Sequence, residues 1–269
     1  MIKKYFHYTI LIVFFLVTIS PAIATQDDNT YYVSNDGSDD NDGLSPDTAW
    51  QTIEHVNTFR LSDNDILLFQ RGDVFRGELR LYKTPVGVTI GAYGDGDNPV
   101  LAGSIAIENW TKTSHASLSD EVYEADISSM TIDDEQGIHH LFVNNELMTL
   151  ARYPNVDSPT QKNWLDVDET AGTNGFKDAA LATLAKPDDY WKGATLRIRN
   201  YSWTYTISKI TSSTGSTGKI QAERLSNQLP EWGYFLDNKL EEIDHPGEWF
   251  YDAATKKVYL YPKNTQLPF

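Results

Sequence analysis

The sequence of 269 residues has no cysteine. This absence excludes disulfide bonds, thiolate catalysis and lipid attachment at a cysteine behind a signal peptide. Positive charge is also scarce, because 22 Lys and Arg stand against 38 Asp and Glu, giving a net charge of −16. Such a surface repels nucleic acid and anionic membranes, so we expect neither as a partner. It also weighs mildly against polyuronates, unless calcium bridges the repulsion.

Residues 1–24 have the pattern of a cleaved signal peptide. Lys3 and Lys4 form a basic start, Ile10–Ile19 is an apolar run, and Ala22 and Ala24 form a small-x-small cleavage site. An uncleaved membrane anchor is the alternative, but the run is shorter than the roughly 20 residues that a membrane span needs. We therefore expect a secreted, periplasmic or extracellular protein.

The stretch from Tyr31 to Asn57 predicts a strand, a turn loop and a short helix. A capping box of Thr48 and Gln51 marks the expected helix start. The apolar face of that helix is expected to hold Trp50, Ile53 and Val56. We predict that this helix caps the first strands of the fold.

Short apolar runs bounded by turn residues follow the helix. Strands of about five residues at such spacing favour an all-β fold, and a β-sandwich remains an alternative on periodicity alone. The predicted strands are Asp65–Phe69, Glu78–Tyr82, Gly87–Tyr93 and Val100–Ala102.

The pattern YYVS…GSDDNDG.SP..AW.TI, followed by DILLFQRGDVFRGEL, carries a first resemblance. It covers roughly Thr30–Gly103 and resembles the start of secreted right-handed parallel β-helix proteins. Many proteins of that kind degrade polysaccharides. The resemblance implies that the predicted strands are the first rungs of such a β-helix.

The pattern changes after residue 105, where the even spacing of strands stops and most of the tryptophans follow. We expect a separate β-rich domain here, inserted into the rungs. Its predicted elements are a hairpin over Leu141–Leu150 turning at Asn144-Asn145, a helix over Phe176–Leu184, a hairpin of Thr195–Arg199 with Trp203–Ile210, and a hairpin of Glu248–Tyr251 with Val258–Tyr261.

Three blocks of this region carry a second resemblance: LFVNNELMTLARYPN, NGFKDAALATLAKPDDYWKGATLRIRNYSWTYTISKI and GYFLDNKLEEIDHPGEWFYDAATKKVYLYP. They resemble the insertion domain of β-helix enzymes similar to glycoside hydrolase family 141. Asn145 stands where that pattern usually has Gly. The implied organisation is a signal peptide over 1–24, a capping helix and first β-helix strands over 25–107, the insertion domain over 108–262, and the start of a return to the β-helix over 263–269.

The resemblance implies the N-terminal part of a secreted carbohydrate-active enzyme, foremost a glycoside hydrolase acting on cell-wall polysaccharide. A polysaccharide lyase and a non-catalytic β-helix surface or glycan-binding protein are the alternatives. Glycoside hydrolysis needs two carboxyl groups beside the scissile bond. In the resembling enzymes these lie on rungs after the insertion domain, so we expect the catalytic residues beyond Phe269 and no activity from this chain alone.

The loop Asp36–Gly43 has the density of oxygen ligands that calcium prefers. It fails the EF-hand template, because Ala49 stands where that loop requires an acid. The competing interpretation is a turn in which Asp and Asn side chains bond backbone amides. We predict no cofactor and no metal site, with calcium as the weaker possibility.

Three residues are candidates for binding a polysaccharide or oligosaccharide: Arg152, Tyr153 and Trp203. A guanidinium beside an aromatic ring can bond sugar hydroxyls or carboxylates while the ring stacks on the pyranose. The alternative for Arg152 is a structural pair with an Asp on the rung beneath it. For Trp203, and for Tyr205 on the same strand face, the alternative is buried aromatic core.

Overall fold

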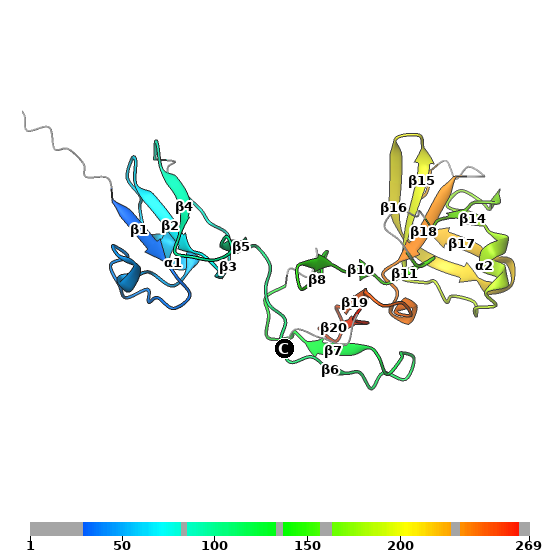
Figure 1. Cartoon of the computed structure of the whole chain (residues 1–269). Coiled ribbons are helices and arrows are strands. Elements are labelled where there is room, and N and C mark those ends of the chain that lie inside the picture. The colour runs from blue at the N-terminus through cyan, green and yellow to red at the C-terminus, as the bar shows by residue number, and fades with distance from the viewer. Residues whose placement is uncertain (1–28, 82–84, 133–136, 157–162, 227–231, 264–269) are drawn as a thin grey trace, which may run out of the picture. The chain divides into compact units, whose positions relative to one another are not determined.

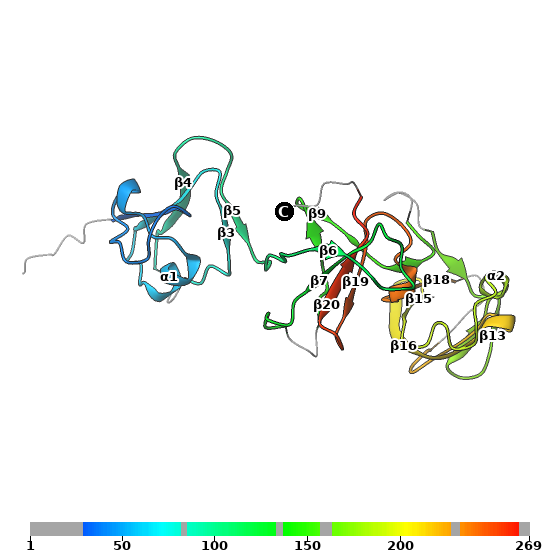
Figure 2. The same cartoon turned by 90° about the horizontal axis from the view of Figure 1, so that it is seen from below.

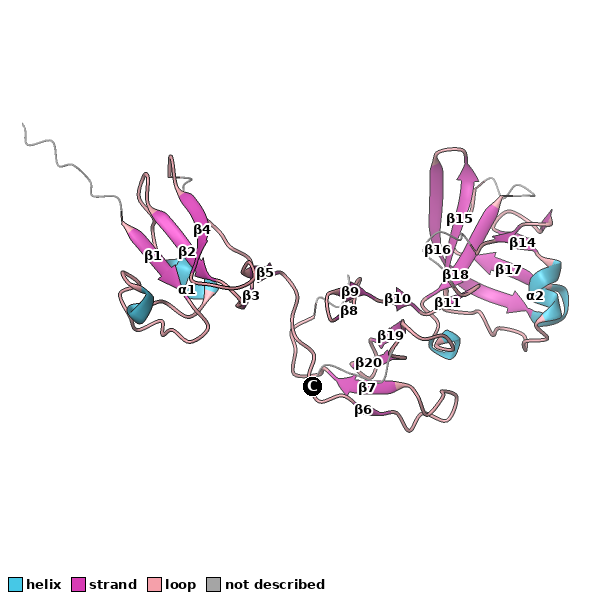
Figure 3. Ribbon diagram, viewed as in Figure 1, coloured by secondary structure: helices cyan, strands magenta, loops and turns pink. Residues whose placement is uncertain are grey.

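A computed structural model describes residues 29–81, 85–132, 137–156, 163–226 and 232–263. The chain forms two compact units, and the first ends at Ile105 while the second begins at Ala106. Strands dominate both units and the helices are short (Figure 3), which confirms the prediction of a mainly β fold. No helix of the described residues is long and apolar enough to cross a membrane. The predicted signal peptide, 1–24, lies outside the described residues.

Unit 1 contains two small parallel sheets (Figures 1 and 2). In each sheet, a strand pairs in parallel with a strand from earlier in the chain. Ile66 lies opposite Thr89 in one sheet, and Val74 lies opposite Val100 in the other. The sheets are β1 (Thr30–Val33), β2 (Ile66–Gln70) and β4 (Thr89–Tyr93), and β3 (Val74–Arg76) with β5 (Val100–Ala102).

The strand predicted at Glu78–Tyr82 is wrong for its described part, 78–81, and β3 precedes it instead. The side chain of Asn57 takes the backbone groups that a strand would use. Its amide nitrogen donates to the Glu78 carbonyl at 2.8 Å, and its oxygen accepts from the Arg80 N–H at 2.7 Å. A side chain thus replaces the neighbouring strand at this point.

The helix predicted to start at Thr48 starts later, as α1 (Ile53–Thr58), with Thr52 as its N-cap. Thr48 instead closes the 3-10 turn η1 (Pro46–Thr48). Asp39 explains the difference, because its Oδ1 accepts the amides of Gln51 at 2.8 Å and Thr52 at 2.9 Å and holds both residues outside the helix. The predicted position of the helix start was therefore wrong.

The apolar face of the N-terminal stretch is buried as predicted. Trp50, Ile53 and Val56 are all at most 2% exposed. Trp50 forms a parallel bridge with Val33 and stacks on Tyr31, with ring centroids 5.0 Å apart. The core of unit 1 consists of Tyr31, Val33, Trp50, Ile53, Val56, Leu67, Phe69 and Phe75.

Replacing Asp39 with alanine is expected to destabilise unit 1 by about 2 kcal/mol, because two amides and the Thr52 hydroxyl lose their acceptor. Burial raises the pKa of Asp39, but hydrogen bonds from Thr52 and Gln51 outweigh burial and lower this pKa below its ordinary value. The carboxylate's contribution is therefore complete above its ordinary pKa and is lost as the pH falls through the folded-state value. Urea unfolding measures the loss, and D40A, which removes an exposed neighbouring acid, should cost little. Equal effects of both variants would contradict this role.

Unit 2 contains a five-stranded sheet and an eight-stranded sheet. The five-stranded sheet has the order β10-β19-β20-β7-β6, and only its β10–β19 pair is parallel. Its strands are β6 (Thr111–Lys112), β7 (Tyr123–Asp126), β10 (Thr149–Leu150), β19 (Glu248–Asp252) and β20 (Lys257–Leu260).

The eight-stranded sheet is antiparallel and has the order β11-β18-β15-β16-β17-β14-β13, with β12 also paired to β18. Figure 1 shows β16, β15 and β18 side by side. The strands are β11 (Arg152–Tyr153), β12 (Leu165–Asp166), β13 (Glu169–Thr170), β14 (Gly175–Lys177), β15 (Thr195–Tyr201), β16 (Thr204–Thr214), β17 (Lys219–Ala222) and β18 (Gly233–Asp237).

One face of the eight-stranded sheet is the main core of unit 2. Leu196, Ile198, Tyr234 and Leu236 are all at 0% exposure. The helix α2 (Ala179–Thr183) packs here through Leu181. The described part of unit 2 also contains the 3-10 turns η2 (Gly215–Thr217) and η3 (Leu240–Glu242).

Two local predictions for unit 2 have different outcomes. The hairpin turning at Asn144-Asn145 is confirmed as β8 (Phe142–Val143) with β9 (Glu146–Leu147), and both asparagines adopt positive φ. The helix predicted from Phe176 begins only after Asp178, whose side chain caps it. Phe176 lies in β14, where its ring packs edge-on against Tyr234.

Candidate functional site

The outer face of β18, β15 and β16 carries aromatic rings and arginines rather than core residues. In β15 the buried Leu196 and Ile198 alternate with Arg197 and Arg199, which point away from the core. Arg197 lies opposite Phe235 on one neighbouring strand and opposite Ile207 on the other. Arg199 lies opposite Tyr205. The register thus places rings and guanidinium groups side by side.

Trp164, just before β12, lies over this sheet. A Cβ added to Gly233 would come within 2.6 Å of the Trp164 ring, so the glycine provides the space that the indole occupies. The Trp164 ring packs edge-on against Tyr205 at 5.6 Å and at a tilt against Phe235 at 5.8 Å. These rings form one continuous surface.

The hairpin turn between β15 and β16 extends the surface. Trp203 at its tip is 82% exposed, and its ring stacks against Tyr201 with centroids 6.2 Å apart and planes 17° apart. Arg199 braces the turn by donating from Nε to the Tyr201 carbonyl and from Nη2 to the Ser202 carbonyl. We call the rings of Trp164, Tyr201, Trp203, Tyr205, Trp232 and Phe235 the aromatic face.

A guanidinium group lies against each of two of these rings. The Arg152 guanidinium lies over Phe235, 3.9 Å from the ring centre, and donates to the carbonyls of Pro154 and Asn163 at 2.9 Å each. The Arg199 guanidinium lies 5.5 Å from the centre of Trp232. Such contacts orient the rings and keep positive charge beside them.

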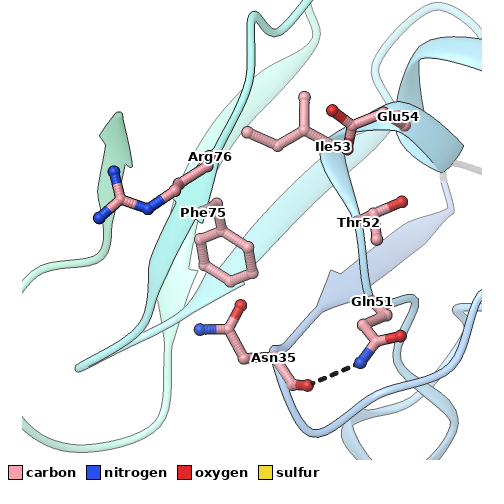
Figure 4. A pocket seen from close by; sticks show the side chains of 7 residues that line it. All are labelled: Asn35, Gln51, Thr52, Ile53, Glu54, Phe75 and Arg76. Atoms are coloured by element: carbon pink, nitrogen blue, oxygen red, sulfur yellow. Dashed lines mark hydrogen bonds between the residues drawn. The ribbon is translucent and has the colours of Figure 1, made fainter. Parts of the chain in front are cut away.

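A second candidate site is a polar pocket of about 330 Å³ in unit 1. Figure 4 shows its side chains, with Gln51 donating to the Asn35 carbonyl at 3.1 Å. Glu54 is the one carboxylate among the lining residues, whereas glycoside hydrolysis requires a pair. The lining residues are Asn35, Gln51, Thr52, Ile53, Glu54, Phe75 and Arg76.

The acidic loop Asp36–Gly43 uses its carboxylates within the turn. Asp39 accepts the amides of Gln51 and Thr52, and Asp42 accepts the Leu44 amide and the Thr48 hydroxyl. In the described part of the chain, no group of three or more His, Cys, Asp and Glu could hold a metal. The expectation of no cofactor, with calcium as the weaker possibility, stays a prediction.

The aromatic face lies inside a recognised domain. Residues 117–263, more than half of the chain, match the GH141 insertion domain. The chain belongs to the GH141 insertion-domain family. No curated protein matches the chain.

Solved structures extend this finding to the fold. A structure described as a glycoside hydrolase matches with a TM-score of 0.61 and 18% identity, over 88% of this chain and 44% of that chain. This likeness shows the fold, and the chain spans less than half of that protein's length. A GH136 lacto-N-biosidase from Eubacterium ramulus is 35% identical over 25% of this chain and 12% of that chain. Its TM-score of 0.20 is too low to indicate a shared fold.

Within the GH141 insertion domain, the three residues predicted to bind sugar are not all together. Trp203 is exposed on the aromatic face, so the alternative of buried core for it and for Tyr205, 54% exposed, is wrong. Arg152 adjoins the face through Phe235. Tyr153 alternates to the other side of β11 and packs toward the main core beside Trp191.

The sequence reasoning missed Trp164, Phe235 and the two arginines of β15. The alternation of Leu196 and Ile198 with Arg197, Arg199 and Tyr201 was a usable signal, because a strand with one apolar face must present the other residues outward. Which residues then meet across strands depends on the register, and no short-range pattern specifies it.

Proposed function

We propose that the chain is part of a carbohydrate-active enzyme of the glycoside hydrolase type, in which the insertion domain contacts polysaccharide through the aromatic face. Membership of the GH141 insertion-domain family and the fold match to a glycoside hydrolase support this. The observation that carries it is Trp203, a stacked indole left 82% exposed at a hairpin tip. Exposed rings of this kind can stack on the apolar faces of sugar rings.

Unit 1 is proposed as the capped beginning of a right-handed parallel β-helix. The parallel register of β1, β2 and β4, and of β3 with β5, supports this, as does the burial of Trp50 against β1. Under this proposal, residues 25–107 form the capped first strands and residues 108–262 the insertion domain. Delivery by a cleaved signal peptide to the outside of the cell or the periplasm belongs to the same proposal.

The proposed reaction is hydrolysis of a cell-wall polysaccharide by paired carboxylates, one acting as acid and the other as base or nucleophile. We propose that this pair lies in the part of the matched fold that the chain does not span. A polysaccharide lyase on the same β-helix is the alternative, and a non-catalytic glycan-binding rod is another.

The products formed by the natural protein that carries this chain distinguish these reactions. Hydrolysis of a polysaccharide panel releases new reducing ends without a carbon–carbon double bond. A lyase releases one ultraviolet-absorbing unsaturated uronate for each cleavage. Retention of glycan without any new reducing end identifies the rod and would reject the hydrolase.

Replacing Trp203 with alanine is expected to weaken glycan binding by this chain at least about fivefold, because an aromatic ring that stacks on a ligand ring contributes on the order of 1–3 kcal/mol. The melting temperature should stay unchanged, since the side chain is already 82% exposed. Affinity electrophoresis in gels containing each polysaccharide measures the retention.

The matched control is F142A. It removes another exposed ring of unit 2, 53% exposed in the β8–β9 hairpin and outside the aromatic face. It should leave retention unchanged. Equal retention of W203A and the unsubstituted protein, or equal loss in W203A and F142A, would reject the aromatic face as the glycan contact.

A further inference from the structure

The aromatic face concentrates positive charge on an acidic protein. The chain has a net charge of −16, yet Arg152, Arg197 and Arg199 all adjoin these rings. Two carboxylates lie on the same side of the sheet: Asp237, which pairs with Arg197, and Asp166, which lies opposite Gly233. Cations outnumber anions here, whereas acids predominate in the sequence as a whole.

Two of these arginines keep unused donors. A guanidinium has five N–H groups. Arg197 donates from Nε to Asp237, and Arg199 donates from Nε and Nη2 to the carbonyls of the hairpin turn. Among the described residues, neither Nη1 group makes a hydrogen bond. Arg199 is exposed and Arg197 is half-buried, so both can reach a ligand lying on the rings.

The arginines occupy positions between rings. Arg199 lies opposite Tyr205 on β16 and beside Trp232, and it braces the turn that presents Trp203. A sugar stacked on Trp203 or Tyr205 would therefore place its ring substituents within reach of a guanidinium. Guanidinium groups match carboxylate and sulfate oxygens better than neutral hydroxyls, because bonds between ions are shorter and stronger.

We propose that the glycan bound by the aromatic face is anionic, with a carboxylate or sulfate group bound by Arg199 and Arg197 while its sugar rings stack on Trp203 and Tyr205. This inference rests on the proposed function of the aromatic face. It also revises the argument that a net charge of −16 disfavours polyuronates. Charges farther away than the Debye length of about 8–10 Å are largely screened, so the local arginines outweigh the distant acids.

Matched pairs of polysaccharides test the charge directly. Polygalacturonate is compared with its methyl ester, and dextran sulfate with dextran, by calorimetric titration of the purified chain. We expect at least one charged member to bind about tenfold more tightly than its neutral partner, with the difference shrinking at high salt. Which pair shows the difference distinguishes a carboxylate from a sulfate.

Charge-removing variants then locate the contact. R199Q is expected to weaken binding of the charged member about tenfold, as loss of a charge-assisted hydrogen bond would, and to weaken the neutral member less, through the loss of its bonds to the hairpin turn alone. R199K should retain most of the preference for charge. K192Q is the matched control. It removes an exposed cation that precedes the first residue of β15, whereas Arg199 lies near the last residue of that strand.

The outcomes separate this inference from the proposed function beneath it. If neutral and charged members bind equally, the face binds glycan but the inference is wrong. If no polysaccharide binds, the proposed function of the face fails as well. If R199Q weakens both members equally, Arg199 only braces the hairpin and the anionic specificity is rejected.

Discussion

Replacing Glu248 with alanine is expected to destabilise the insertion domain by about 3 kcal/mol, because three partly buried backbone N–H groups lose their acceptor. The Glu248 side chain is buried, and the residue is only 2% exposed. Its Oε1 accepts from Arg152 N at 3.3 Å, and its Oε2 accepts from Asp244 N at 3.2 Å and His245 N at 3.1 Å. Breaking the hydrogen bonds of a buried side chain is among the costlier changes that a single substitution can make.

The position of Glu248 explains why its loss affects the whole domain. Glu248 lies in β19 opposite Thr149 of β10, in the five-stranded sheet. β10 ends at Leu150, and two residues later Arg152 starts β11 of the eight-stranded sheet. The carboxylate therefore bonds the chain at the point where it passes from one sheet to the other.

The same residue predicts how stability depends on pH. Burial raises the pKa of Glu248 to about 8, although the N–H bonds of Asp244, His245 and Arg152 favour the charged form. Between its ordinary pKa of about 4.5 and 8 the folded state binds a proton that the unfolded state has released. Stability should therefore fall as pH rises through this window, by up to about 1.4 kcal/mol per pH unit, and level off above it.

Three variants test both statements by urea unfolding from pH 4.5 to 9. E248A should lose the most stability, whereas E248Q should lose less, because its amide oxygen still accepts bonds. E248Q should also reduce the pH slope, so its deficit is largest near pH 5 and shrinks toward pH 8, whereas the raised pKa values of the buried Asp178, Asp237 and Glu242 leave a remainder. E121Q, at an exposed acid of the same unit, should retain the slope. An unchanged slope in E248Q would show that another group titrates.

Local chemistry made several elements predictable. Asn144 and Asn145 mark a tight hairpin because asparagine tolerates positive φ, and the structure places both there. The apolar spacing of Trp50, Ile53 and Val56 correctly indicated a buried face. The start of the helix did not follow from its capping-box pattern, because Asp39, distant in sequence, holds the amides of Gln51 and Thr52.

The site was less predictable because it depends on contacts between distant residues. Trp203 was predicted as the first residue of a strand, but it lies in the turn before β16, and its stacking with Tyr201 and its exposure follow from the closed hairpin. Trp164 joins the face only because Gly233, far along the chain, leaves space beneath it. Tyr153 illustrates the converse, because its neighbour Arg152 faces the rings while Tyr153 faces the core.

Replacing Trp50 with alanine is expected to destabilise unit 1 by about 3–5 kcal/mol, the usual cost of removing a buried tryptophan. Trp50 is 2% exposed and packs against Tyr31, Phe59 and His55. Gly43 lies so close that a Cβ there would approach the indole within 2.5 Å, so the ring fills its site completely. The cavity left by alanine would expose the end of the parallel strands.

This variant also tests whether the two units fold independently, as the proposed division near residue 107 requires. Hydrogen exchange of W50A should accelerate in the strands β1, β2 and β4 and remain unchanged in β15, β16 and β18. L44A is the control, because Leu44 lies in the same loop but is 52% exposed. Accelerated exchange in both units would show one cooperative fold, and unit 1 would then act as a structural part of the insertion domain rather than as the separate start of a β-helix.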